Sequence, residues 1–309
     1  MNAAAGQMTA LLADIGATNA RFALLRDGQL SEVQALRVAD FPASYDAIAE
    51  ALRRCGSAQV PQAAALAFAG PVDGARSVMT NAGWDTTVGE LRQRFGFSQV
   101  RLLNDYTALA LSLDRLGDDD KMAIGSPDAP APPPDAAGPP NTLAVLGPGS
   151  GLGVAALLPA APRPLPLVSE GGHVTLPAVD ALEADLIAVL REDFGHVSAE
   201  RLLSGPGLSN LHQGLARLQG MAAAPLAPAD VTRRGLDGSD PLCRLALERF
   251  CLFLGTFAAD VALSYGARGG VFLGGGILPR FPEFLAASGF RARFEDKGRF
   301  RGYLAAIPP

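Results

Sequence analysis

Residues 10–25 read ALLADIGATNARFALL, two apolar segments on either side of a short polar turn. This pattern predicts two short strands joined by a tight turn. The carboxylate of Asp14 ends the first strand, and Gly16 permits an unusual backbone angle and the close approach of a ligand. Thr18 and Asn19 offer hydroxyl, amide and backbone donors of the kind that phosphate oxygens need, and Asp14 could hold Mg²⁺ directly or through water. An ordinary hairpin turn is the alternative interpretation.

A second stretch has the same form. Residues 143–158, LAVLGPGSGLGVAALL, again predict strand, glycine turn and strand, and two such hairpins suggest a duplicated architecture. The four glycines between Gly147 and Gly153 cost conformational entropy, which a second phosphate-binding turn would explain. No GK[ST] follows, and a strand rather than a helix comes next, so the turn is neither a P-loop nor a dinucleotide fingerprint. A tight structural hairpin remains the alternative.

Three consecutive glycines, 274–276, follow the apolar strand segment VFL. They leave a flat stretch of backbone on which a planar base could lie. A packing turn between a helix and a strand explains them as well.

Asp105 stands where a predicted strand, VRLLND (100–105), meets a predicted helix, YTALALSL (106–113). Such junctions often carry catalytic groups in α/β folds, because their side chains face a crevice. In phosphoryl transfer an Asp commonly removes the proton of the acceptor hydroxyl. Asn104 beside it could hydrogen-bond sugar hydroxyls. An Asn-Asp helix cap is the competing explanation.

Glu170-Gly171-Gly172-His173 places a carboxylate and an imidazole where both can point into one cavity. A zinc site is the competing reading, but His196 and His212 show no ligand spacing with His173, and no cysteine is near. Polar and stacking contacts to a sugar could also come from the segment Met79-Thr80-Asn81 with Trp84, although a lone Trp is more often part of a core.

The remaining pattern predicts helices over 41–54, 88–96, 180–195 and 240–265, a strand over 65–70, a strand running into a glycine turn over 269–281, and an exposed loop over the proline-rich residues 125–141.

The chain has 309 residues, is 49% hydrophobic and 18% charged, and carries a net charge of −5, a globular composition. The chain has no Lys/Arg cluster of the kind that forms a nucleic-acid-binding surface. Three cysteines without a CxxC pair, no signal peptide and no membrane-length apolar run indicate a soluble protein of the cytoplasm.

The chain resembles the bacterial glucokinase family, within the actin-like, hexokinase-related ATPase fold, in eight segments that occur in the family's order: ADIGATNARFALL, FAGPV…MTNAGW, RLLNDYTALAL, GPGSGLGVA, SEGGHVTLP, GHVSAERLLSGPGLSNL, GGVFLGGGILPRF and SGFRARFEDKGRFRGYLAAIP. The resemblance implies an α/β, ribonuclease H-like fold of two domains, residues 1–115 and 116–309, with a cleft between them. It also implies ATP as phosphoryl donor, Mg²⁺, glucose as acceptor and a homodimer.

Site residues follow from the same resemblance. Asp105 would be the base that activates the glucose 6-hydroxyl, and domain closure would exclude water. Glucose would be bound by Asn81, Asn104, Asp105, Glu170, His173 and Glu200. ATP would be held by Asp14, Gly16, Ala17, Thr18 and Asn19 in the first phosphate turn, by Gly149, Ser150 and Gly151 in the second, and by Gly274, Gly275 and Gly276 at adenosine, with Asp14 as the Mg²⁺ ligand.

The chain departs from the family pattern at Ala17, where a second Gly is usual, and at Ala75 and Thr175, where an Asp is usual. We expect these changes to be tolerated. The sequence ends at Pro309, whereas relatives continue with a strand and a helix that return to the first domain. At roughly 25 cal/mol per Å² of apolar surface, losing a packed helix would cost several kcal/mol. We therefore expect lower stability and activity than in longer relatives.

Two alternatives stay close to this prediction: a kinase for another hexose such as mannose or fructose, and a truncated sugar-binding protein with weak activity. A sugar-responsive transcription regulator of the related repressor/kinase superfamily fits less well. Only 13 residues precede Asp14, too few for a helix-turn-helix, and the cysteine-rich zinc motif of that superfamily is missing.

Overall fold

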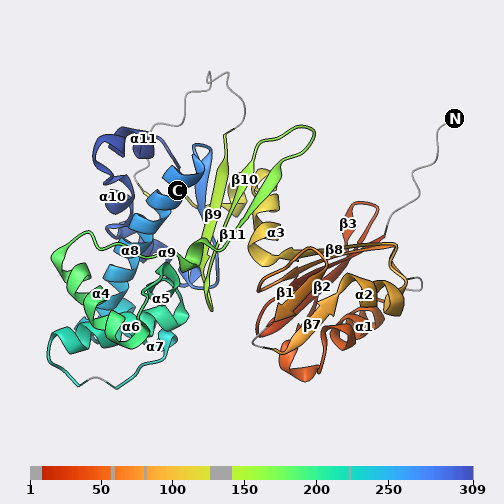
Figure 1. The fold of residues 1–309 in the computed structure, drawn as a ribbon, viewed down its shortest axis with the longest axis horizontal. Coiled ribbons are helices and arrows are strands. Elements are labelled where there is room, and N and C mark those ends of the chain that lie inside the picture. Colours follow the sequence, from red (N-terminus) through yellow and green to blue (C-terminus); the bar gives the residue numbers. More distant parts are fainter. Residues whose placement is uncertain (1–8, 57–59, 80–81, 126–140, 223, 309) are drawn as a thin grey trace. The chain divides into compact units, whose positions relative to one another are not determined.

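A computed structural model describes residues 9–56, 60–79, 82–125, 141–222 and 224–308. The chain divides into two compact units, Met1–Leu109 and Ala110–Pro309, each built on one mixed sheet (Figure 1). The boundary lies within helix α3 (Asp105–Ser112), compared with the expected boundary after residue 115. The loop expected over 125–141 lies almost wholly outside the described residues.

The sheet of the first unit has the strand order β3-β2-β1-β5-β8, with β4 also paired to β2. Its strands are β1 (Ala10–Ile15), β2 (Asn19–Arg26), β3 (Gln29–Leu30), β4 (Gln34–Arg37), β5 (Ala63–Phe68) and β8 (Gln99–Asn104). β1 and β2 form the predicted antiparallel hairpin, whereas β1, β5 and β8 run parallel. Since Ile15 lies beside Phe68 and Phe68 beside Asn104, the carboxyl ends of these three strands meet at one edge.

Two helices and a hairpin complete the first unit. α1 (Ser44–Arg54) packs on β2 and β4, α2 (Val88–Phe95) packs on β8, and the hairpin of β6 (Arg76–Met79) and β7 (Trp84–Thr87) contacts both helices through β7. α2 ends at Gly96 in the left-handed conformation, as its sequence predicts. α1 begins after Pro42, three residues later than expected. The core of this unit includes Leu11, Ile15, Phe22, Ile48, Phe68 and Trp84.

The second sheet repeats the arrangement of the first. Its order is β11-β10-β9-β12, from β9 (Leu143–Pro148), β10 (Leu152–Leu158), β11 (Leu165–Ser169) and β12 (Gly270–Leu273). β9 and β10 form an antiparallel hairpin, β11 adds to it antiparallel, and β12 runs parallel to β9. β3, β2, β1 and β5 have the same order and directions, so the duplication suggested by the two glycine-turn hairpins is confirmed.

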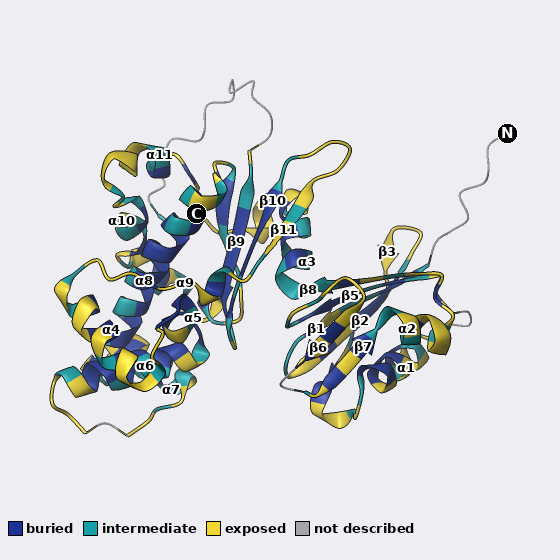
Figure 2. Cartoon of the chain, in the orientation of Figure 1, coloured by how far each residue is buried: buried dark blue, intermediate teal, exposed yellow. Residues whose placement is uncertain are grey.

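Helices surround the buried helix α8 (Pro241–Tyr265) in the second unit (Figures 1 and 2). The others are α4 (Ala181–Phe194), α5 (Ala199–Leu202), α6 (Gly205–Leu218), α7 (Pro228–Asp237), α9 (Pro282–Ala287), α10 (Phe290–Glu295) and α11 (Arg301–Ala305), with a short 3-10 segment before α9 and another before α11. α4 and α8 match their predicted ranges to within one residue. None of the helices in the described parts of the chain combines the length and apolarity needed to cross a bilayer.

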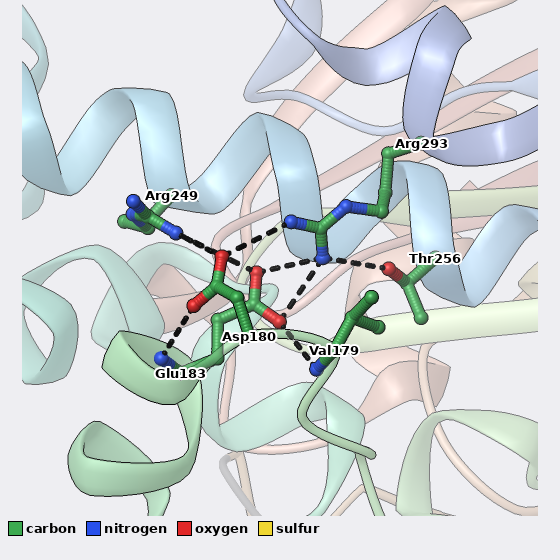
Figure 3. Close-up of polar contacts among 6 residues, drawn as sticks. All are labelled: Val179, Asp180, Glu183, Arg249, Thr256 and Arg293. Carbon is green, nitrogen blue, oxygen red and sulfur yellow. Dashed lines mark hydrogen bonds and ion pairs between the residues drawn. The ribbon is translucent and has the colours of Figure 1, made fainter. Parts of the chain in front are cut away.

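A buried ion network joins α4, α8 and α10 (Figure 3). Glu183 on α4 is fully buried, and its Oε1 accepts a 2.8 Å hydrogen bond from Nη1 of Arg293 on α10. Nη1 of Arg249 on α8 donates to Oδ2 of Asp180 at 2.6 Å, and Arg293 Nη2 reaches the same oxygen at 3.3 Å. Burial alone would raise the pKa of Asp180, but hydrogen bonds from Glu183 N and Arg249, with both arginine charges, hold it below its usual range. The network ties three helices distant in sequence into one body.

Candidate active site

Asn104, and not Asp105, caps helix α3. Oδ1 of Asn104 accepts hydrogen bonds from the backbone N–H groups of Tyr106 at 2.9 Å and Thr107 at 3.2 Å. Its Nδ2 donates to the carbonyl oxygen of Gly70 at 3.1 Å, which links the end of β8 to the end of β5. The helix-cap interpretation is therefore confirmed for Asn104, and the carboxylate of Asp105 is not needed as the cap.

Asp105 is a half-buried carboxylate at the first residue of α3. Its Oδ1 accepts a hydrogen bond from Tyr106 N at 2.9 Å. Burial raises the pKa of Asp105 to about 6, the negative charge of Asp14 adds to this rise, and the hydrogen bonds oppose it only in part. Asp105 is therefore mostly ionised at neutral pH, yet a stronger base than an ordinary Asp.

The first glycine turn places Asp14 beside Arg21, which was not among the predicted site residues. Oδ2 of Asp14 lies 3.2 Å from Nη1 of Arg21, and both side chains are 58% exposed. The two residues face each other in the β1–β2 register, so the predicted turn over 16–19 was itself the signal that could have identified Arg21. The turn closes with a 2.9 Å hydrogen bond from Gly16 N to Asn19 O, and Thr18 O accepts from Val38 N.

Glycine is favoured at position 16 for a different reason from the expected one. The prediction of an unusual backbone angle is wrong, because the φ of Gly16 is not in the left-handed region. A Cβ there would instead lie 3.3 Å from the carbonyl oxygen of Asn19, a tight contact. Among the described residues Asp27 alone combines a side chain with positive φ, so Ala17 fits this turn without backbone strain.

The second glycine turn, residues 149–151, is held by backbone and side-chain contacts within its own unit. Gly149 N donates to Gly151 O at 2.8 Å, and Gly205 N at the start of α6 donates to Gly149 O at 2.8 Å. Oε2 of Glu200 on α5 accepts from Leu152 N at 2.9 Å. A Cβ on Gly151 would lie only 2.5 Å from this oxygen, whereas Ser150 is exposed.

Glu170, His173 and Glu200 form one polar cluster in the second unit. His173 Nε2 lies 4.0 Å from Glu170 Oε2, and His173 Nδ1 lies 4.0 Å from Glu200 Oε1. Gly172 allows this segment to approach β10, since a Cβ there would lie 2.1 Å from Leu152 O. Glu200 therefore contacts the glycine turn with one carboxylate oxygen and approaches His173 with the other.

The three glycines 274–276 are anchored beside the second turn. Gly274 N donates to Leu146 O at 2.8 Å. Gly275 has φ +83°, and a Cβ there would lie 2.3 Å from Pro148 O, while at Gly276 no heavy atom lies within 4 Å of that position. The carboxyl edge of β9 and β12 thus collects the residues expected for ATP in this unit.

The stacking role considered for Trp84 is wrong. Trp84 is 1% exposed and donates from Nε1 to Phe41 O at 3.2 Å, so it belongs to the core of the first unit, as does Met79 at 2%. Thr80 and Asn81 lie outside the described residues. Thr175, one of the departures from the family pattern, places its hydroxyl 2.9 Å from His196 Nε2.

Comparisons with known proteins agree with this arrangement. A family model described as "Glucokinase" matches residues 11–309. A glucokinase of Nitrobacter hamburgensis is 46% identical over 303 residues, which cover 97% of this chain and 92% of that protein. The crystal structure of a glucokinase from an Antarctic psychrotroph has a TM-score of 0.84 at 36% identity, covering 97% and 92% of the two chains.

A more distant structure, the glucokinase of Balamuthia mandrillaris in complex with glucose, has a TM-score of 0.77 at 22% identity and covers 99% of this chain and 90% of its own. At that identity the likeness establishes the fold, the two-domain α/β actin-like fold expected from the sequence. From the family match and the curated relatives, the chain belongs to the glucokinase family.

Proposed function

We propose that this protein transfers the γ-phosphoryl group of ATP to the 6-hydroxyl of D-glucose, with Asp105 as the general base. The observation that supports this role best is the half-buried carboxylate of Asp105, with its pKa near 6, at the same sheet edge as the Asp14–Asn19 turn. A base must be ionised at the working pH and still attract a proton, and this pKa meets both needs.

In the reaction, Asp105 accepts the proton of the 6-hydroxyl while the hydroxyl oxygen forms a bond to the γ-phosphorus. The bond between that phosphorus and its bridging oxygen breaks, and its electron pair leaves with ADP. The rest of catalysis is positioning and charge stabilisation. Backbone N–H groups of the turns at residues 16–19 and 149–151 would bind phosphate oxygens, and residues 274–276 would contact adenosine.

The residues around Asp14 fit a magnesium ion. Mg²⁺ in phosphoryl-transfer sites binds one or two carboxylates together with substrate phosphates and water, and Asp14 offers an exposed carboxylate at the end of β1. When bound there, the ion would offset the negative charge of the phosphates. Arg21, 3.2 Å from Asp14, would orient the carboxylate that holds it.

Glu170, His173 and Glu200 would bind sugar hydroxyls. Each ring nitrogen of His173 lies 4.0 Å from an oxygen of one glutamate, a spacing at which one hydroxyl group can hydrogen-bond to both partners. Asn104 has its carbonyl oxygen engaged in the helix cap and one amide hydrogen donated to Gly70 O, so we assign it one sugar contact through its second amide hydrogen. Asn81 remains a predicted contact. The homodimer implied by the family also remains a prediction, which sedimentation equilibrium would test.

The test is ADP release measured with glucose, mannose and fructose for the wild-type chain and for Asp105→Asn. We expect glucose to be preferred and kcat of the variant to fall about 10²–10⁴-fold, the usual contribution of a general base. The variant should fold, because burial disfavours the charge that it removes. A wild-type rate in Asp105→Asn would refute the assignment of the base.

Other outcomes of the panel distinguish the alternatives. A preference for mannose or fructose would make the chain a kinase for another hexose. Glucose binding without sugar-dependent ADP release would favour the sugar-binding protein with weak activity.

A further inference from the structure

Three side chains with metal-binding chemistry meet in the second unit, and none of them belongs to the proposed reaction. A ring nitrogen of His212, a carboxylate oxygen of Asp240 and Sγ of Cys243 all lie within 4.8 Å of one another. His212 and Cys243 are buried, with exposures of 3% and 0%, and the side chain of Asp240 is 26% exposed. The cluster therefore opens to solvent on the side of its carboxylate.

Helix packing holds the three residues in place. Asp240 is the N-cap of α8, and its Oδ1 accepts from Leu242 N at 2.9 Å and Cys243 N at 3.2 Å. α7 approaches the first turn of α8 so closely that a Cβ on Gly235 would lie 2.8 Å from Cys243 O. His212 reaches the same place from α6. The positions of the ligands are thus set by α6 and α8 and do not depend on a mobile loop.

The imidazole supplies independent support for a bound ion. Nδ1 of His212 is buried and has no hydrogen-bond partner in the described parts of the chain. A buried polar atom without a partner is costly, and such atoms are rare in folded proteins. A metal ion bound at Nδ1 would remove that cost.

We propose that His212, Asp240 and Cys243 bind a zinc ion that fastens α6 to the start of α8, with water as the fourth ligand on the exposed side. Imidazole nitrogen, thiolate sulfur and carboxylate oxygen are the donors that Zn²⁺ takes in proteins. Magnesium avoids sulfur, so this site is distinct from the one assigned to Asp14. One thiolate and one carboxylate balance the charge of the ion, which allows it to be buried.

Two features determine how the ion would enter. Ligand atoms around tetrahedral zinc lie about 3.5 Å apart, so the cluster must contract slightly upon binding. Asp240 keeps Oδ1 for the helix cap and offers Oδ2, which lies 3.9 Å from Nη1 of Arg234. Zinc binds the thiolate form of cysteine, so binding should release the thiol proton of the buried Cys243 and strengthen as pH rises.

Cobalt is the spectroscopic probe for this site, and Cys251 is the matched control. Cys251 lies on the same helix, is also fully buried, and has its pKa raised by burial to about 12. One equivalent of Co²⁺ added to chelator-treated full-length protein should give a thiolate-to-cobalt charge-transfer band in the wild type and in Cys251→Ser. The band should be lost in Cys243→Ser and in His212→Phe. Its absence from the wild type, or its persistence in Cys243→Ser, would overturn the proposal.

A second measurement covers the case in which those variants fail to fold. Asp240→Asn keeps an oxygen for the helix cap but loses the charge, so it should fold and bind Zn²⁺ at least tenfold more weakly by equilibrium dialysis. Zn²⁺ should also raise the thermal midpoint of the wild type and of Cys251→Ser by the same amount. Equal zinc affinities in the wild type and Asp240→Asn would place the ion elsewhere and refute the site.

Discussion

Asp105 owes its proposed role to its neighbour. Asn104 supplies the cap of α3 with its side-chain oxygen, so the Asp105 carboxylate is not needed to begin the helix. Its half-buried position, with Asp14 nearby, then raises its pKa to about 6. In the proposed mechanism, the Asn-Asp segment therefore divides structure and chemistry between its two members.

The pH dependence of catalysis should report this pKa. We expect kcat/KM to fall tenfold per pH unit below about pH 6, because only the ionised Asp105 can accept a proton. In Asp14→Asn, whatever its rate, the midpoint should move to lower pH, because one negative charge near Asp105 is removed. A wild-type midpoint near 3.8, the ordinary value for Asp, would contradict the proposed environment.

The same shift has a consequence for stability, and its sign is fixed by linkage. The folded state binds a proton at Asp105 more tightly than the unfolded state, so this residue opposes folding at neutral pH. That penalty is relieved as the pH falls from about 6 towards 3.8. Activity should therefore fall in that range while the contribution of Asp105 to stability improves.

At the level of elements, the glycine turns lie at the proposed site because each follows a strand that pairs in parallel with another. The turn at residues 16–19 follows β1, Asp105 follows β8, and residues 274–276 follow β12. Since parallel strands present their carboxyl ends at one edge, each sheet gathers its polar residues on one side. Neighbouring glycines in these turns nevertheless have different structural roles.

Gly275 and Gly276 provide a direct comparison. Gly275→Ala would force a side chain into a left-handed conformation and place its Cβ 2.3 Å from Pro148 O, so we expect a loss of about 1–3 kcal/mol in unfolding free energy. Gly276→Ala meets no atom within 4 Å and should remain close to wild type. Urea unfolding of both variants checks this, and equal midpoints would show that the turn can rearrange.

At the scale of the whole chain, two duplicated sheets are stabilised differently. Apolar packing against α1 and α2 dominates the core of the first unit, whereas the second surrounds the long helix α8 and adds the buried ion network of Figure 3. A buried ion pair is weak evidence for stability as a whole, but removing one partner leaves a charge without compensation.

Glu183→Gln should therefore lower the unfolding free energy of the second unit by about 3–5 kcal/mol, because the guanidinium of Arg293 loses its fully buried counter-charge and keeps only the partly exposed Asp180, which it shares with Arg249. Glu192 lies on the same helix α4 as Glu183 and forms an exposed pair with Arg217 of α6. Glu192→Gln breaks this pair and should cost at most about 1 kcal/mol. Chemical unfolding followed by circular dichroism compares the two. Similar losses in both variants would mean that the network contributes no more than a surface pair.

Most of the site could be predicted from short segments. Glycine turns between apolar strands, the strand-to-helix junction at Asp105 and the Glu170–His173 pair are local patterns, and each was read within a window of a few residues. Family resemblance added Glu200, for which no local pattern exists. The burial of Trp84 could not be predicted locally, because burial depends on how helices cover a sheet. The pairing of Arg21 with Asp14 was accessible from the turn at residues 16–19, because that turn sets the β1–β2 register.

The sequence by itself determined the two glycine-turn hairpins, the strand-to-helix junction at Asp105 and the long helices α4 and α8, because glycine, proline and apolar periodicity act over a few residues. It also determined the family, through eight segments in a set order. The tertiary structure alone decided that Asn104 caps α3 so that Asp105 is not needed as the cap, that Glu200 joins the glycine turn to His173, and that His212 meets Cys243. Residues far apart in the chain become neighbours only when helices and sheets pack, and packing brought these groups together.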